Sequence, residues 1–425
     1  MQNKIYPETF QFQDEWKIDG ISIKNLAEKY GTPLYVLDKK TLITQAQKYI
    51  NSWKKYYKNN FKVLFAIKAL PVLEVIRIFH KEGLGVLVST GGELFIARSA
   101  GVDSHKIYFH GNAKSIPELE YAIKENIGAI IIDNFDEYEK IKFLTNKYST
   151  SINVLIRLIP NIEVSTHKSI RTGQMDTKFG LPINQVYELI ERIKKEKHIN
   201  FKGLHAHLGS QIFDISAYTK LAEVLSEIYN NLKSNDINIE EMSIGGGLGI
   251  AYTKDDNPPE IEDLAYQVSQ KFEETIGHHF TLICEPGRSL VGRAGITIYK
   301  IESRKEIPGI RKYISVDGGM SDNIRPALYG AKYTALLITS NEGTKTIYTI
   351  AGKHCESGDI LIRDFEDKWP NYGDYLITFS TGAYNFSMFT WYNATLRPGV
   401  VLIENGTDRL IVKRDTYEDL LRGQI

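Results

Sequence analysis

Four short apolar runs decide the fold, and they read VLFAIK (63–68), GVLVST (85–90), KIYFHG (106–111) and AIIIDN (129–134). Each run is continuous rather than alternating and is rich in β-branched residues, which is typical of strands buried on both faces. Amphipathic stretches of helical period lie between the runs, for example IPELEYAIKEN (116–126). The sequence therefore predicts buried strands that alternate with helices.

The alternation continues through four more runs, NVLIRLI (153–159), FKGLHAHLG (201–209), EMSIGGG (241–247) and TLICEPG (281–287). Eight such strands alternating with helices favour a parallel (β/α)8 barrel. An open doubly wound parallel sheet is the alternative for the same pattern. Ser115 before Pro117 and Asn134 before Asp136 are expected helix starts.

The pattern changes near residue 290. Helical periodicity nearly vanishes, and strand-like runs such as KYISVD, KTIYTIAG and DYLITFS take over, with turn signals between some of them. The sequence predicts a cofactor-binding barrel over residues 36–288 and a mainly β domain made of residues 289–425 with residues 1–35. Two domains also suit a length of 425 residues, at which a single core usually stops growing.

The composition is that of an ordinary globular protein, with 42% hydrophobic residues, 24% charged residues and a formal net charge of zero. This balance gives no electrostatic reason to expect a nucleic acid or an anionic membrane as a partner. The first residues lack the apolar core of a signal peptide, and no apolar run approaches the roughly 18 residues of a transmembrane helix. Cys284 and Cys355 show neither a metal spacing nor a disulfide framework, so a cytoplasmic location is expected.

Polar residues of chemical interest follow the expected strands at their C-terminal ends, where barrel enzymes carry their active sites. They are Lys68, Thr90, His110, Asn134, Arg157, His207, Gly245, Gly246, Gly247 and Glu285. Random scatter would put about half of them at the opposite ends. Their agreement in position predicts an active site at this end of the barrel.

Three of these features suggest a cofactor with an aldehyde and a phosphate. Lys68 has apolar flanks. Burial lowers the pKa of a lysine, so that more of its amine is uncharged and able to act as a nucleophile. The glycine run at 245–247 could open a helix and direct backbone N–H groups at a small anion, or could form only a structural turn. Glu285 follows a buried strand and needs a cationic partner, either Arg288 or a pyridinium nitrogen. Pyridoxal 5′-phosphate, held by Lys68 as a Schiff base, is the leading candidate.

A metal site is the competing interpretation. His205 and His207 alternate by two, so on a strand they share one face, and such a pair can bind zinc. A metal-dependent barrel hydrolase would need more histidines and an aspartate at other strand ends, whereas this chain adds His110 and ends its eighth run in Glu285. We therefore expect no metal, and instead a flat imidazole that stacks on a cofactor ring while Ser210 reaches a phosphate.

Ten motifs in a fixed order resemble the fold-type III pyridoxal-phosphate-dependent decarboxylases, nearly from end to end. The motifs are FAIKA, GGELFIARSAGV (91–102), FHGNAKS (109–115), THKSIRTGQMDTKFG (166–180), GLHAHLGSQIFD (203–214), IGGGLGIAY (244–252), EPGR, IRPALYGA (324–331), CESGD (355–359) and TGAYNFSM (381–388). The resemblance implies an alanine-racemase-like architecture of barrel and β domain. It also implies pyridoxal phosphate as cofactor, a small amino-acid substrate, and a homodimer whose active sites use both chains.

The resemblance further implies individual roles. Lys68 would bind the cofactor aldehyde, His207 would stack on the ring, and Glu285 would pair with the ring nitrogen. The phosphate region would be held by Ser210, Gly245, Gly246, Gly247, Gly287, Arg288 and Tyr384. Substrate carboxylates would be bound by Arg288, Arg325, Tyr329 and Tyr384. Cys355 would donate a proton and Glu356 would bind the distal ammonium of the substrate, both across the dimer interface.

The implied reaction is the decarboxylation of meso-2,6-diaminopimelate to L-lysine and carbon dioxide, the last step of lysine synthesis. The ground for this substrate is Glu356, because ornithine-type relatives lack a glutamate at that position. The alternative is another diamino acid or conjugate, such as ornithine, lysine, or a polyamine or siderophore precursor. Departures from the family pattern at Leu87, His354, Phe389 and Trp391 bear on this choice. A catalytically dead homologue would have lost cofactor ligands that this chain keeps.

Overall fold

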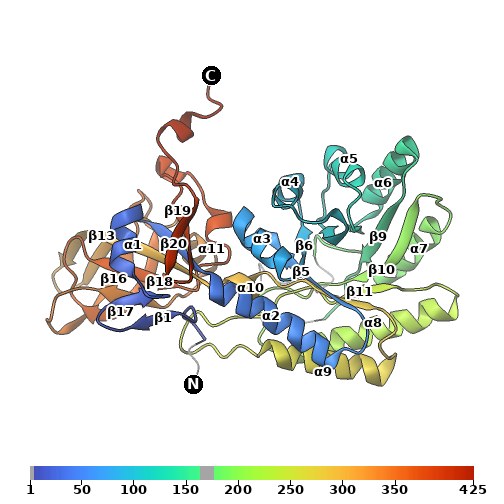
Figure 1. The fold of residues 1–425 in the computed structure, drawn as a ribbon, viewed down its shortest axis with the longest axis horizontal. Helices are drawn as coiled ribbons and strands as arrows, with labels where there is room; N and C mark the ends of the chain where they lie inside the picture. Colours follow the sequence, from blue (N-terminus) through green and yellow to red (C-terminus); the bar gives the residue numbers. More distant parts are fainter. Residues whose placement is uncertain (1–3, 163–176) are drawn as a thin grey trace. The chain divides into compact units, whose positions relative to one another are not determined.

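The computed structural model describes residues 4–162 and 177–425, and the chain divides into two compact units. One unit, called the barrel unit, comprises residues 43–249 and 258–289. The other, called the β unit, comprises residues 1–42, 250–257 and 290–425. Figure 1 shows the elements of both units.

The barrel unit is built on eight parallel strands that close on themselves in the order β10-β11-β12-β5-β6-β7-β8-β9. The strands are β5 (Phe61–Ala66), β6 (Gly85–Val88), β7 (Ile107–Phe109), β8 (Ala129–Ile132), β9 (Ile152–Arg157), β10 (Ile199–His205), β11 (Glu241–Ser243) and β12 (Thr281–Cys284). The predicted (β/α)8 barrel is confirmed. The open doubly wound sheet is excluded because the strand ring is closed by the pairing of β12 with β5 and of β9 with β10.

Helices connect successive strands on the outside of the barrel (Figure 1). The connecting helices are α3 (Leu73–Lys81), α4 (Gly91–Ser99), α5 (Ile116–Lys124), α6 (Phe135–Tyr148), α7 (Ile183–Ile193), α8 (Ser216–Ser234) and α9 (Ile261–Thr275), and α2 (Lys39–Tyr56) leads from β4 into β5. Helices that follow one another, such as α4, α5 and α6, are also neighbours in space.

Both expected helix starts are confirmed. Ser115 and Glu118 form a capping box at the start of α5, in which each side chain accepts a hydrogen bond from the other residue's backbone N–H. The side chain of Asn134 accepts a hydrogen bond from the Glu137 N–H, 3.0 Å away, at the start of α6. These caps fix the points at which the chain leaves the barrel ends and turns outward.

The inside of the barrel is packed with side chains and is not a pore. Eight of them form one buried cluster: Leu64, Ala66, Leu87, Tyr108, Ala129, Ile131, Leu155 and Ile283. Toward the N-terminal ends of the strands, Nζ of Lys62 lies 2.7 Å from the Tyr108 hydroxyl and is also paired with Glu241. The layered filling is that of a packed barrel core.

The β unit contains two sheets. The small one joins β1 (Phe10–Phe12), β2 (Trp16–Ile18) and β3 (Ile21–Ser22), and α1 (Ile23–Tyr30) follows it. The strands of the nine-stranded sheet are β4 (Leu34–Asp38), β13 (Gly295–Ile307), β14 (Arg311–Val316), β15 (Ala335–Ile338), β16 (Lys345–Ala351), β17 (Ile360–Lys368), β18 (Tyr375–Phe379), β19 (Gly399–Glu404) and β20 (Thr407–Val412). Strand β4 lies between β13 and β19, so a segment near the N-terminus is part of the sheet formed by the C-terminal strands.

The described residues also form two short α-helices, α10 (Arg288–Val291) and α11 (Arg325–Tyr329). Among the residues that the structure describes, no helix is both long enough and apolar enough to cross a membrane.

We predict that Ser115→Ala destabilises the barrel unit by about 1 kcal/mol, because it removes one half of the capping box that starts α5. The measurement is the urea midpoint of wild type and variant. An unchanged midpoint would show that the backbone N–H groups at this helix end find other partners.

Candidate active site

The structure places the predicted polar residues at one end of the barrel, each directly after or at the end of a different strand. In strand order from β5 to β12 they are Lys68, Thr90, His110, Asn134, Arg157, His207, the glycines 245–247 and Glu285. The sequence-based prediction of their common position is therefore confirmed. One detail is wrong, because β5 ends at Ala66 and Lys68 lies in a 3-10 turn, Ile67–Ala69. The backbone leaves the sheet early there because the Leu70 N–H turns back to the Ile67 carbonyl.

Glu285 is a buried carboxylate held by two neighbouring strands. Its Oε2 lies 3.0 Å from Nε2 of His205, and its Oε1 accepts a hydrogen bond of 2.7 Å from the Ser243 hydroxyl. Burial by itself would raise the pKa of Glu285, but the charge and hydrogen bond of His205, with the Ser243 hydrogen bond, lower it below its usual value. Glu285 is therefore a buried negative charge across the neutral pH range.

The expectation that Arg288 could be the partner of Glu285 is wrong. Nη2 of Arg288 donates a hydrogen bond of 2.9 Å to the Ser210 hydroxyl. The sequence places Arg288 three residues after Glu285, but the chain enters helix α10 at Arg288 and directs the two side chains to different partners. Ser210 and Arg288, both predicted to bind phosphate, are thus brought together as a hydroxyl and a guanidinium.

Two histidines at this end of the barrel are neutral at physiological pH. Burial, followed by the positive charges of Lys68 and Arg157, lowers the pKa of His207 well below its usual value. Burial and the charge of Lys68 do the same to His110. Nδ1 of His207 accepts a hydrogen bond of 3.3 Å from the Gly246 N–H, which leaves the proton of the neutral ring on Nε2. His207 therefore offers a flat, uncharged ring in a fixed orientation.

The glycine run after β11 packs tightly against the ends of both neighbouring strands. A Cβ on Gly246 would lie 2.0 Å from the Glu285 carbonyl oxygen, and one on Gly247 would lie 2.3 Å from the Gly209 carbonyl oxygen. The expected helix after this run is wrong, since the next helix is α9, which begins at Ile261. The run instead continues the strand pairing, with the Glu285 N–H bonded to the Gly245 carbonyl. The glycines allow backbone to approach backbone beside His207.

Sequence reasoning missed three buried charged residues near this end of the barrel, Lys114, Asp133 and Glu137. Nζ of Lys114 is paired with Glu137 and donates to the Ile131 carbonyl at 2.9 Å. Arg157 lies 3.9 Å from Asp133 and stacks over the ring of Phe179 at 4.5 Å. No local pattern identifies such pairs, because their members come together only when adjacent strands pair in the sheet.

The β unit holds the remaining predicted site residues in two groups. Arg325, at the start of α11, is buried against the rings of Tyr252 and Tyr333, whose centroids lie 4.8 and 5.5 Å from its guanidinium carbon. Burial alone would lower the pKa of Arg325, but the two tyrosines raise it, so it stays charged. Tyr333 also reaches Asn385, the residue after Tyr384, at 3.4 Å.

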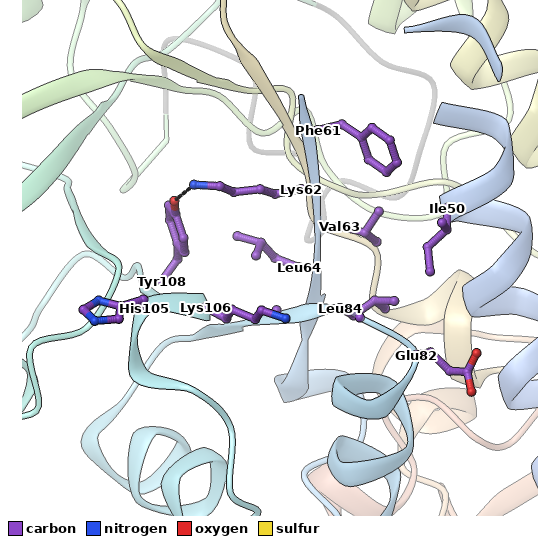
Figure 2. Close-up of a pocket in the computed structure, with 12 residues that line it drawn as sticks. Ile50, Phe61, Lys62, Val63, Leu64, Glu82, Leu84, His105, Lys106 and Tyr108 are labelled. Atoms are coloured by element: carbon purple, nitrogen blue, oxygen red, sulfur yellow. Dashed lines mark hydrogen bonds between the residues drawn. The ribbon is translucent and has the colours of Figure 1, made fainter. Parts of the chain in front are cut away.

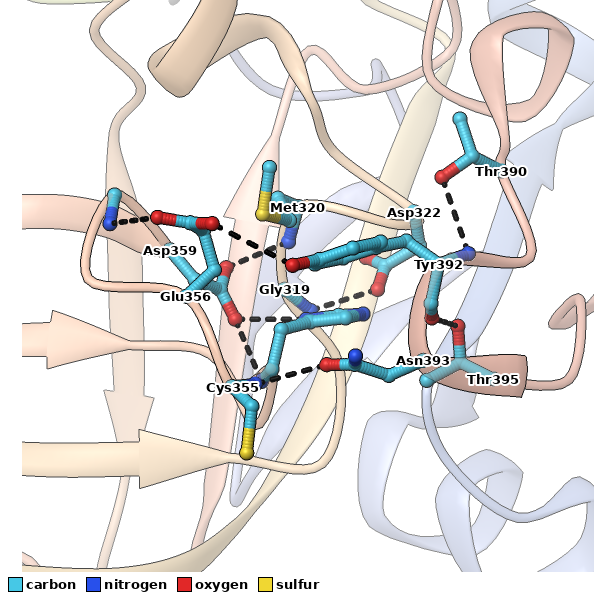
Figure 3. Close-up of polar contacts among 12 residues, drawn as sticks. Gly319, Met320, Asp322, Cys355, Glu356, Asp359, Thr390, Tyr392, Asn393 and Thr395 are labelled. Atoms are coloured by element: carbon cyan, nitrogen blue, oxygen red, sulfur yellow. Dashed lines mark hydrogen bonds and ion pairs between the residues drawn. The ribbon is translucent and has the colours of Figure 1, made fainter.

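The second group is the Cys355–Glu356 loop (Figure 3). Both residues are exposed, and the loop is held by contacts with Tyr392 and Asn393. Tyr329 ends helix α11, and Tyr384 has a left-handed backbone with φ of 63°. Of the motif at residues 166–180, the part from 166 to 176 lies outside the described residues.

A cavity of about 370 Å³ opens at the other end of the barrel (Figure 2). Its lining includes Lys62 and Leu64 of β5, Glu82 and Gly85 before and in β6, and Tyr108. Lys62, Glu82 and Gly85 begin or precede their strands, whereas the predicted site residues end or follow theirs. The cavity is therefore separate from the candidate site.

The residues of the barrel site fit pyridoxal phosphate. They comprise a primary amine (Lys68), a neutral flat ring (His207) and a buried carboxylate that is ionised (Glu285), while Ser210 and Arg288 supply a hydroxyl and a cation suited to a phosphate. The described residues contain no group of three or more His, Cys, Asp or Glu side chains that could hold a metal ion.

Comparison with known proteins agrees with this chemistry. Residues 43–292 match the family described as "Pyridoxal-dependent decarboxylase, pyridoxal binding domain". The chain is 44% identical to a diaminopimelate decarboxylase of Synechocystis over 96% of its length and 90% of the relative's. It is 41% identical to that of Bacillus subtilis, over 96% and 94%. The crystal structure of diaminopimelate decarboxylase from M. jannaschii is similar with a TM-score of 0.93 at 36% identity, covering 98% of both chains.

We predict that His110→Gln flattens the dependence of unfolding free energy on pH. The pKa of His110 is lowered in the folded protein and is about 6.5 when unfolded, so its neutral form stabilises the fold above about pH 6.5 and that stability is lost as pH falls. Each such histidine contributes a slope approaching about 1.4 kcal/mol per pH unit below that point. Urea unfolding from about pH 7 to about pH 5 measures the slope. His279→Gln, at an exposed histidine of the same unit, is the control, and equal slopes for H110Q and wild type would contradict the prediction.

Proposed function

Since the chain belongs to the diaminopimelate decarboxylase family of pyridoxal-dependent decarboxylases, we propose that it converts meso-2,6-diaminopimelate to L-lysine and carbon dioxide, the last step of lysine synthesis. The observation that carries the proposal is the placement of Lys68, His207 and Glu285 at one end of the barrel, in a chain similar to its relatives over nearly its whole length. The M. jannaschii relative has also been crystallised with L-lysine, the proposed product, which supports this substrate over other diamino acids.

Pyridoxal phosphate is the cofactor of this family, and when bound it supplies a sink for the electron pair left behind as carbon dioxide departs. Lys68 would hold the aldehyde end through its amine. Ser210, Arg288, Gly287, Tyr384 and the glycines 245–247 would hold the phosphate. His207 would cover one face of the cofactor ring and exclude water from it.

Glu285 would keep a proton on the ring nitrogen of the cofactor. Its low pKa means that the carboxylate accepts a hydrogen bond rather than donates one. His205 and Ser243 already occupy one position on each carboxylate oxygen, and each oxygen has a second acceptor position. Loss of the Glu285 charge would therefore weaken the electron sink without changing the shape of the site.

Substrate recognition is proposed to use charges of both signs. Diaminopimelate carries an ammonium and a carboxylate at the end remote from the bond that breaks, so a selective site needs a cation and an anion. We assign the cation to Arg325, which its two tyrosines keep charged, and the anion to Glu356. Tyr329, Tyr384 and Arg288 would complete the binding of the substrate carboxylates.

Cys355 is proposed to return a proton to the α-carbon after carbon dioxide leaves. Cys355 and Glu356 are both exposed in the single chain, which suits residues that work in the site of a partner chain. We therefore propose a homodimer in which each chain supplies these two residues to the other. Cys284 and Cys355 are free thiols, which suits a reducing cytoplasm.

Turnover and cofactor binding test the proposal together. The purified protein should show the visible-edge absorbance of bound pyridoxal phosphate and release lysine from meso-diaminopimelate. Lys68→Ala should abolish both signals, since its amine would tie the cofactor to the barrel, whereas Lys81→Ala at an exposed lysine of α3 should change neither. Wild-type absorbance in K68A would refute the role of Lys68. Release of carbon dioxide from ornithine or lysine, but not from diaminopimelate, would refute the substrate.

We predict that Glu356→Gln raises KM for diaminopimelate about 10- to 100-fold and leaves cofactor affinity within about twofold, because a charge-assisted contact contributes about 1.5–3 kcal/mol. The control is Glu366→Gln, at an exposed glutamate of β17. Steady-state kinetics and cofactor titration measure the two effects. Equal losses of substrate and cofactor binding in E356Q would remove the reason for assigning Glu356 to the substrate.

A further inference from the structure

The segment from Thr390 to Thr395 contacts the loop that carries Cys355 and Glu356 (Figure 3). We propose that two residues of this segment are positioning residues for the reaction. Asn393 fixes the backbone of the proton donor Cys355, and Tyr392 fixes the carboxylate of Glu356. This inference rests on the proposed function, from which the roles of Cys355 and Glu356 are taken.

Asn393 meets two demands at once. Its backbone is left-handed, with φ of 52° and ψ of 27°, a conformation that asparagine tolerates better than most residues. Its Oδ1 accepts a hydrogen bond of 2.8 Å from the Cys355 N–H. Glycine would satisfy the first demand without the second, and alanine would satisfy neither. The backbone of Cys355 is thus tied to a residue 38 positions later in the chain.

Tyr392 contacts the same loop from the neighbouring position. Its hydroxyl lies 3.4 Å from Oε2 of Glu356, and its ring stacks on His354 with centroids 5.9 Å apart and an interplanar angle of 14°. A tyrosine here restricts the rotamers of a glutamate that is otherwise exposed.

The loop is anchored by a buried contact between His354 and Asp359. Nδ1 of His354 lies 2.7 Å from Oδ2 of Asp359, and that carboxylate also accepts the His354 N–H at 2.9 Å. Its other oxygen accepts the Met320 N–H at 2.7 Å. His354 departs from the family pattern, and the structure gives it two uses, a partner for Asp359 and a platform for Tyr392.

The contacts of Asn393 and Tyr392 with the loop contribute to positioning more than to folding. Cys355, Glu356, Tyr392 and Asn393 are all exposed, so their hydrogen bonds compete with water and add little to stability. A reacting group displaced by about 1 Å can lose about 100-fold in rate. The expected consequence of freeing the loop is therefore a change in kinetics without a change in unfolding midpoint.

Three variants separate the hydrogen bond of Asn393 from its backbone conformation. Asn393→Gly keeps the left-handed backbone and removes the acceptor, while Asn393→Asp keeps both. Asn405→Gly is the matched control, because Asn405 is also exposed and left-handed, with φ of 52°, in the β19–β20 turn. We expect N393G to lower kcat about 10-fold or more with KM within about twofold, and N393D and N405G to stay within about threefold of wild type in both.

Hydrogen–deuterium exchange provides a readout that does not need activity. The Cys355 amide should exchange about fivefold faster in N393G than in wild type, and at the wild-type rate in N393D and N405G, since one hydrogen bond contributes about 1 kcal/mol. Unchanged exchange in N393G, or equal acceleration in N393G and N393D, would overturn the role of Asn393. Slow exchange of the Cys355 amide in wild type, combined with no decarboxylation of diaminopimelate, would refute the proposed function. It would leave the hydrogen bond between Asn393 and Cys355 in place.

Tyr392→Phe tests the contact between Tyr392 and Glu356, and its expected effect is on KM rather than on kcat. It removes the hydroxyl that reaches Glu356 and keeps the ring that stacks on His354. We expect KM to rise about three- to fivefold at unchanged kcat, in contrast to N393G. A loss confined to kcat would overturn the assignment of Tyr392 to substrate binding.

Discussion

The barrel site depends on one buried negative charge, the carboxylate of Glu285. It follows β12, and its partners His205 and Ser243 end β10 and β11, so a single carboxylate connects three adjacent strands. A charge buried in this way is costly unless it is paired and hydrogen-bonded. Here the pairing outweighs the desolvation, and the pKa falls rather than rises. The same anion is the group that the proposed chemistry requires beside a pyridine nitrogen.

The positive charges around the site have the opposite effect on its histidines. Lys68 and Arg157 add to burial in keeping His207 and His110 neutral. In the same site the carboxylate of Glu285 is therefore ionised while the imidazoles of His207 and His110 are neutral. The surroundings of each group cause this difference in protonation. The glycines at 245–247 make this possible by letting the chain after β11 pass within backbone contact of His207 and Glu285.

The sequence predicted the barrel, its helix caps and the common end at which the polar residues gather, because each depends on local pattern and on the rules of parallel sheets. It was wrong where the outcome depended on contacts between distant segments. The glycine run resembled a helix start, yet its backbone groups pair with β12. Arg288 was a reasonable partner for Glu285 by spacing, yet the turn into α10 directs it to Ser210. The grouping of Asn393 with Cys355 had no sequence signal beyond an asparagine in a segment that departs from the family.

By itself, therefore, the sequence determined the order of strands and helices, the end of the barrel at which the polar residues gather, and the candidate amine, ring and carboxylate, since these follow from periodicity and residue type. Only the tertiary structure decided which partner each charged group has. That choice is made by the pairing of β10, β11 and β12, which brings His205 and Ser243 to Glu285, and by the loop contacts of the β unit, which bring Asn393 to Cys355. Such pairings depend on distances between segments that are far apart in the sequence. The free energies of desolvation and hydrogen bonding depend on those distances, which only the folded structure sets.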